Sequence, residues 1–276
     1  MTRLWSLSNG FVIGSERSGK GDVMCMDAVS RLARFGCVTG GAALCLLLRP
    51  PSVSAQTIAP MIVEYHADHN GRAKGTFAVG NPSLFPVNVV LEPLSFNVDE
   101  KGDPAYRRLD PSVRVRLSAA SFRVPPRQTY TVAYELETDR LPAWFTVYAT
   151  ISLATNDQTV KVALRLPHTV YLLPKEPLDE RAVVFLRSES NREIHAIQVE
   201  IENTGAQYGR VQQVEVSSPR GKQIFNGFPF FPGQRRTVIL PWDDSEAPNQ
   251  VVMRFKAFKV SHAIDSSGTV YASSQK

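Results

Sequence analysis

The feature of this sequence that most restricts its fold is a long alternating segment, T-V-K-V-A-L-R-L-P-H-T-V-Y-L-L-P, from Thr159 to Pro174. In its first half every second residue is aliphatic, so a strand here has one apolar and one polar face. The apolar pattern resumes after Pro167, and the segment therefore exceeds the roughly 5 or 6 residues of an average strand. We expect it to run the length of a domain. Its alternating aliphatic residues are Val160, Val162, Leu164 and Leu166.

Shorter runs of the same kind precede this segment, and from Gln56 onward the chain shows almost no helical periodicity. Proline, glycine and asparagine separate the runs, as turns between strands require. With the long segment they make seven strands in about 115 residues, the number and spacing of an immunoglobulin-like sandwich. The six shorter runs are Met61–Tyr65, Gly75–Val79, Val87–Leu91, Val113–Leu117, Tyr130–Tyr134 and Phe145–Ile151.

A second group of alternating runs follows the connector P-K-E-P at residues 174–177, whose two prolines stiffen a short linker. We therefore predict an all-β chain with two tandem immunoglobulin-like β-sandwich domains, the first over residues 56–174 and the second over residues 178–276. The runs of the second domain are Ile197–Ile201, Arg210–Val216, Lys222–Phe225, Arg236–Leu240 and Val251–Val260.

The N-terminal part, residues 1–55, differs from the rest. Arg31 and Arg34 precede an apolar run over residues 35–48, and small residues follow up to Ala55. This order is typical of a secretory signal peptide that is cleaved near Ala55. The run is too short to span a bilayer about 30 Å thick. We expect an exported, periplasmic product that is not inserted in the membrane.

Removal of residues 1–55 also changes the charge. The whole chain carries a formal charge of +5, but the remaining 221 residues contain 25 Lys and Arg against 23 Asp and Glu. A balance near +2 does not favour binding to nucleic acid or to anionic lipid. All three cysteines lie within residues 1–55, so no disulfide is expected in the exported product.

No pattern of catalytic residues stands out in the sequence, and we expect no enzymatic activity and no cofactor. The segment G-S-E-R-S-G-K at residues 14–20 resembles a phosphate-binding loop, but Gly21 stands where a Mg²⁺-binding hydroxyl is needed. The cluster His66, Asp68 and His69 is followed by Asn70-Gly71, which predicts a solvated turn rather than a metal site.

Several short motifs resemble one known family. The F-x-V-P-P-x-Q segment at residues 122–128, the L-P pair at residues 141–142 and the alternating V-x-V-A-L-x-L pattern before the linker follow one another in this order. In the second domain, Asn203 ends a strand and a P-G turn follows at residues 232–233. The order and spacing resemble the periplasmic pilus-assembly chaperones, the PapD-like family, in a divergent form.

This resemblance implies a boomerang arrangement of the two domains and a role in pilus or fimbrial biogenesis. In that family the last strand of the first domain is lent to a subunit that lacks one strand, a mode of strand addition that is well known for pilus chaperones. Here Val160, Val162, Leu164 and Leu166 would be the donated side chains. A pilus or coat-type subunit and an outer-membrane usher would be the partners, and the free edge could self-associate. The alternative is that these four side chains face the core of their own domain.

The family also implies an anchor for the terminal carboxylate of the subunit, in the cleft between the domains. The usual arginine and lysine are absent, since Thr169 stands where the lysine is expected. The candidates for the anchor are Arg165, His66 and Thr169. A second hypothesis is an exported structural or adhesive module that binds carbohydrate or protein through its loops, and an exported enzyme with an unrecognised site is a third.

Overall fold

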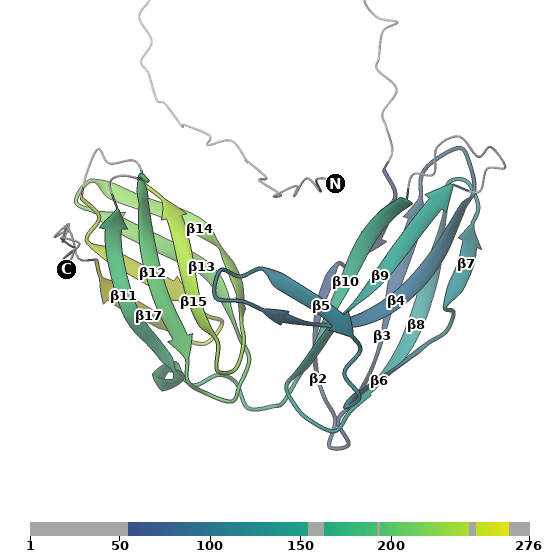
Figure 1. The fold of residues 1–276 in the computed structure, drawn as a ribbon, viewed down its shortest axis with the longest axis horizontal. Helices are drawn as coiled ribbons and strands as arrows, with labels where there is room; N and C mark the ends of the chain where they lie inside the picture. Colours follow the sequence, from purple (N-terminus) through teal and green to yellow (C-terminus); the bar gives the residue numbers. More distant parts are fainter. Residues whose placement is uncertain (1–54, 154–162, 192–193, 243–246, 265–276) are drawn as a thin grey trace, which may run out of the picture. The chain divides into compact units, whose positions relative to one another are not determined.

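The computed structural model describes residues 55–153, 163–191, 194–242 and 247–264, and these form two β-sandwiches in tandem (Figure 1). One short 3-10 helix, Glu180–Ala182, is the only helical element among the described residues. The predicted all-β fold with two sandwiches is therefore confirmed. The predicted leader up to residue 54 and the donor candidates Val160 and Val162 lie outside the described residues.

The first sandwich contains strands β1 to β10 in two sheets. One sheet has the order β1-β3-β8-β6 and the other β2-β10-β9-β4-β5, with β7 also paired to β4. Taken in chain order, these are the A-B-E-D and G-F-C sheets of an immunoglobulin-like sandwich. The strands are β1 (Thr57–Ala59), β2 (Ile62–His66), β3 (Arg72–Asn81), β4 (Val87–Val98), β5 (Pro104–Arg108), β6 (Val113–Leu117), β7 (Ser121–Val124), β8 (Gln128–Thr138), β9 (Ala143–Leu153) and β10 (Ala163–Leu173).

The second sandwich is smaller and follows the same plan, with one sheet in the order β11-β12-β15 and the other in the order β14-β13-β16-β17. Its ladders are all antiparallel. The strands are β11 (Val183–Asn191), β12 (Ala196–Asn203), β13 (Gly209–Ser218), β14 (Gly221–Phe230), β15 (Arg235–Pro241), β16 (Gln250–Arg254) and β17 (Lys259–Ala263).

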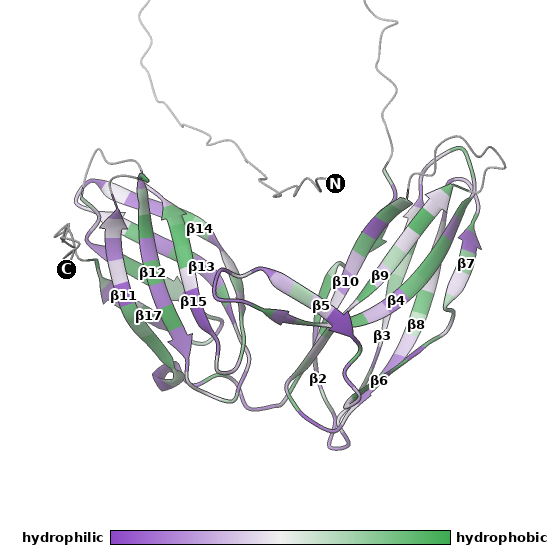
Figure 2. Ribbon diagram, in the orientation of Figure 1, coloured by the Kyte–Doolittle hydropathy of each residue, from purple (hydrophilic) through white to green (hydrophobic). Residues whose placement is uncertain are grey.

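Each sandwich encloses its own apolar core, because every second residue of the central strands faces the opposite sheet. Figure 2 shows this alternation of hydrophobic and hydrophilic residues along the strands. Phe77, Val132 and Phe145 are buried in the first core, and Ile201 and Phe230 in the second. Burial of these side chains is the main force that stabilises each domain.

The predicted strands differ from the observed ones in two respects. The alternating run Val251–Val260 is not one strand, because the chain turns between β16 and β17, where the N–H of Phe255 donates to the carbonyl of Phe258. The rings of these two residues stack in this turn with their centres 4.6 Å apart. Because both residues are apolar, the sequence pattern looked like one continuous strand. Strands β1, β5, β7 and β11 were not predicted.

Candidate functional site

The long segment singled out in the sequence forms β10, and its two edges are used unequally. On one edge β10 pairs with β9 in antiparallel fashion from Ala163 to Leu172. On the other edge it pairs with β2 in parallel fashion, but only from Thr169 to Leu173. Among the described residues, the stretch from Ala163 to His168 has no strand on that second edge. We call this stretch the open half-edge.

The open half-edge exists because the first strand of the domain changes sheets. Strand β1 pairs with β3 in one sheet, whereas β2 pairs with β10 in the other. The chain crosses between them at Pro60 and Met61, where the Thr169 N–H donates to the Met61 carbonyl at 2.7 Å. The residues before Met61 do not pair with β10, because they form β1 in the opposite sheet.

The backbone polarity of the open half-edge follows from the same contact. Successive N–H groups of a strand point to opposite edges, so Arg165 and Ala163 share the direction of Thr169 and point away from β9. Pro167 has that direction too, but it lacks an N–H group. A proline inside a strand of 11 residues is tolerated where its missing donor faces an unpaired edge. The open half-edge therefore offers the amide groups of Ala163 and Arg165.

The aliphatic side chains of the open half-edge face inward but remain accessible. Leu164 lies opposite Ile151 and Leu166 lies opposite Ala149, and directly opposed residues share one face of a sheet. Leu166 is partly buried against the core, whereas Leu164 is 37% exposed. Further along the same face, Leu172 is only 2% exposed. Apart from His168 the face is thus apolar, and it opens to solvent toward its N-terminal end.

His168 closes the open half-edge at the point where the first strand crosses. Its ring is fully buried, stacks on Phe77 with the ring centres 4.6 Å apart, and lies 3.0 Å from the Tyr134 hydroxyl through Nε2. Its Nδ1 lies 2.6 Å from the carbonyl oxygen of Pro60, which fixes Nδ1 as the donor. Burial lowers the pKa of His168, because the charged imidazolium loses its hydration. A neutral histidine therefore holds the crossing chain in place.

The three residues predicted as a carboxylate anchor do not share a binding point. Arg165 pairs with Glu92 at 2.9 Å and lies over the ring of Tyr148 at 4.0 Å. The Nδ1 of His66 lies 2.9 Å from the Pro174 carbonyl oxygen. The hydroxyl of Thr169 lies 3.0 Å from that of Thr146. Each group already has its own partner, and the anchor stays a prediction.

An arginine that the sequence analysis did not single out, Arg210, contacts Glu64 on β2. The Nε of Arg210, on β13, donates to a carboxylate oxygen of Glu64 at 2.6 Å, and the Tyr208 hydroxyl donates to the same oxygen at 3.1 Å. The Nη2 of Arg210 is buried without a hydrogen-bond partner. No spacing in the sequence links position 64 to position 210, so only the fold could reveal this contact.

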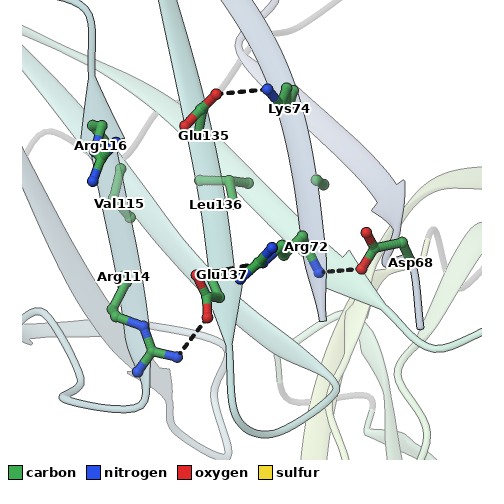
Figure 3. A pocket seen from close by; sticks show the side chains of 10 residues that line it. Asp68, Arg72, Lys74, Arg114, Val115, Arg116, Glu135, Leu136 and Glu137 are labelled. Carbon is green, nitrogen blue, oxygen red and sulfur yellow. Dashed lines mark hydrogen bonds and ion pairs between the residues drawn. The ribbon is translucent and has the colours of Figure 1, made fainter. Parts of the chain in front are cut away.

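A hollow on the outer face of the β3-β8-β6 sheet is lined by charged residues (Figure 3). Lys74 pairs with Glu135 at 2.6 Å, and Arg114 pairs with Glu137 at 3.0 Å. The hydrogen bonds from Lys74 and Arg114 lower the pKa of Glu135 and of Glu137, respectively. A general acid at neutral pH needs a raised pKa instead. This row of exposed ion pairs therefore does not favour acid–base catalysis.

The described residues contain no group of three or more His, Cys, Asp or Glu side chains arranged to hold a metal ion. At the predicted turn, Asp68 accepts from the N–H groups of Asn70 and Arg72, both at 2.8 Å. Its carboxylate thus serves the backbone of the turn. Within the same described part of the chain, no helix is long and apolar enough to cross a membrane.

No protein-family model matches the chain, and no curated protein matches its sequence. Among solved structures it is similar to the YadV chaperone, with 11% identity and a TM-score of 0.49 over 75% of this chain and 98% of that chain. It is also similar to the class 5 fimbriae chaperone CfaA, with 12% identity and a TM-score of 0.46 over 76% of this chain and 99% of that chain. A third similar structure is a complex of Salmonella enterica SafA pilin with the SafB chaperone, with 13% identity and a TM-score of 0.44 over 76% of this chain and 96% of that chain. At these identities and TM-scores the likeness by itself assigns no function.

Proposed function

We propose that this protein is a periplasmic chaperone that binds an unfinished secreted subunit by donor-strand complementation, in which β10 lends its open half-edge to a subunit that lacks one strand. The observation that carries the proposal is that β10 pairs on both edges only from Thr169 onward. A strand edge with free amide groups is a template for another chain.

The composition of the open half-edge supports this function. Proteins protect exposed edges with short strands, proline and charged residues. The described edges of the first sandwich follow this rule: β1 has 3 residues, β6 carries Arg114 and Arg116, and β5 begins with Pro104. The open half-edge also contains Arg165 and Pro167, but it combines the free amide groups of Ala163 and Arg165 with an accessible Leu164. Such an edge would promote aggregation unless a partner covered it.

The proposed client is a subunit of a pilus or coat-type structure, and an outer-membrane usher would receive the complex. The half-edge supplies backbone hydrogen bonds for affinity and alternating aliphatic side chains for specificity. In this proposal the aliphatic set Val160, Val162, Leu164 and Leu166 enters the groove of the client. No covalent step is required, so the protein acts without a catalytic residue or cofactor.

Co-purification tests this function. A secreted pilus-type subunit from the producing organism would be co-expressed with the wild-type chain, with Leu164→Glu and with Ile239→Glu. Ile239 is a matched control because it is an exposed aliphatic residue, 59% exposed, on a strand of the second sandwich. Burial of one leucine contributes about 1.5 to 3 kcal/mol, so Leu164→Glu should weaken capture by about ten-fold or more.

Ile239→Glu should capture the subunit as the wild type does. Equal capture by Leu164→Glu and the wild type would overturn the strand-addition mechanism. That result would instead agree with an adhesive module that binds through its loops.

A further inference from the structure

The most exposed large hydrophobic side chains of the described residues belong to one short loop. Leu84 is 67% exposed and Phe85 is 60% exposed, and both lie between β3 and β4 in the segment N-P-S-L-F-P at residues 81–86. Single exposed apolar residues are common on protein surfaces. Two adjacent large ones on the same loop require either a structural reason or a partner.

This loop is held in one conformation by a buried asparagine. Asn81 is 1% exposed, and its amide nitrogen donates to the carbonyls of Phe85, Val124 and Pro125 at 2.9 to 3.0 Å. Its amide oxygen accepts from the N–H and the hydroxyl of Ser83. Leu84 and Phe85 are therefore presented on a fixed backbone, which lowers the entropic cost of binding a partner.

The second sandwich contains the same turn and shows that exposed apolar residues are not needed to build it. Asn203 is fully buried, its amide nitrogen donates to the carbonyl of Gln207 at 2.8 Å, and its amide oxygen accepts from the N–H of Gly205 at 3.0 Å. Asn81 makes the equivalent bonds to the residues four and two positions further on. Where the first loop carries Leu84 and Phe85, the second carries Ala206 and Gln207.

Two arginines lie next to this loop in the fold. The carbonyls of Val124 and Pro125, to which Asn81 donates, belong to the segment that contains Arg123 and Arg127. Both arginines are exposed, and neither forms an ion pair with a described residue. Arg127 has a φ of 56° as the third residue of the turn Pro125–Gln128, in which the Gln128 N–H donates to the Pro125 carbonyl at 3.3 Å.

We propose that Leu84, Phe85, Arg123 and Arg127 form a docking surface for a second protein partner, one that presents an apolar pocket flanked by carboxylates. The two side chains fill the pocket and the two guanidinium groups pair with the carboxylates. We call these four residues the Leu84–Phe85 surface. Strand β9 lies between β10 and β4, so a strand on the open half-edge leaves this surface accessible. The inference is independent of the proposed function.

Site-specific cross-linking in the producing cells tests this surface. A photoreactive phenylalanine analogue is placed at Phe85 and, as a control, at Ala206, an exposed residue that has the place of Leu84 in the equivalent turn. Cross-linked peptides are then mapped by mass spectrometry. We expect one abundant adduct from position 85, with Asp or Glu beside the cross-linked site, and none from position 206. Arg123→Glu with Arg127→Glu should reduce this adduct about ten-fold or more.

Two further variants make the result decisive. Replacement of the mapped acidic residues of the partner by lysine should restore the adduct of the Arg-to-Glu variant, and Leu164→Glu should leave the adduct of position 85 unchanged. The proposal is overturned if no adduct forms, if position 206 gives an equal adduct, or if charge reversal has no effect. It is also overturned if Leu164→Glu abolishes the adduct, because the partner would then be the client held by the open half-edge.

Discussion

The two sandwiches share one strand plan but treat their last strands differently. In the first, the last strand β10 has 11 residues, and the first strand crosses over to cover only its C-terminal half. In the second, the last strand β17 has 5 residues, and β11 stays in the opposite sheet. The exposed positions of β17 are Lys259, Ser261 and Ala263, whereas the exposed end of β10 includes Leu164. Exposed aliphatic residues also lie on edge strands of the second sandwich, such as Ile224 on β14 and Ile239 on β15. What distinguishes the first sandwich is a last strand that carries an accessible leucine and is covered along only part of one edge.

The largest expected difference in stability between the two sandwiches comes from their buried asparagines, Asn81 and Asn203. Asn81→Ala removes the donor for three carbonyl groups, whereas Asn203→Ala removes it for one. Each buried polar group left without a partner costs about 1 to 3 kcal/mol. We expect Asn81→Ala to destabilise its sandwich by about 3 kcal/mol or more, and Asn203→Ala by about a third as much. Urea unfolding of both variants measures the difference, and equal losses would contradict it.

A smaller effect is a pH dependence caused by His168 in the first sandwich. Its pKa is lowered in the folded state, so the unfolded chain binds more protons below about pH 6.5. The contribution of the neutral ring is therefore complete above this pH and decreases as the pH falls toward the lowered pKa. The loss is at most about 1.4 kcal/mol per pH unit.

Urea unfolding between pH 7.5 and 5 measures this dependence. His168→Gln keeps a polar group in the site but cannot titrate, so its stability should depend less on pH than that of the wild type. An equally steep pH dependence in His168→Gln would show that other groups cause it.

The smallest effect concerns the ion pairs on the sheet surfaces. In the first sandwich Glu137 pairs with Arg114 and Arg72, and its side chain is 38% exposed. In the second, Glu215 pairs with Arg254 and Lys222, and its side chain is 10% exposed. Exposed pairs contribute little and are screened by salt. We expect Glu137→Gln to leave the urea midpoint unchanged and Glu215→Gln to lower it. A larger effect of Glu137→Gln would contradict this ranking.

The sequence predicted the strands that carry a clear alternating pattern, and it failed where the pattern is absent. All five residues of β5 are exposed, so no alternation marks it, and β1 is too short to show a period. The breaker Asn81-Pro82 could be recognised as a turn, but the bonds of its side chain depend on residues more than 40 positions away. The contact of Glu64 with Arg210 is of the same kind. Local pattern predicts elements, whereas side-chain contacts between distant segments require the fold.

The open half-edge of β10 is tested most directly by thermal melting of two matched variants, Leu164→Glu and Leu172→Glu. Both positions lie on the same face of the same strand, but Leu164 is 37% exposed and Leu172 is 2% exposed. A carboxylate buried without a partner destabilises a domain by several kcal/mol, so Leu172→Glu should unfold the first sandwich or lower its melting temperature strongly. Leu164→Glu should melt close to the wild type. A collapse of Leu164→Glu comparable to that of Leu172→Glu would show that Leu164 belongs to the core, and the half-edge would then not be free for a client.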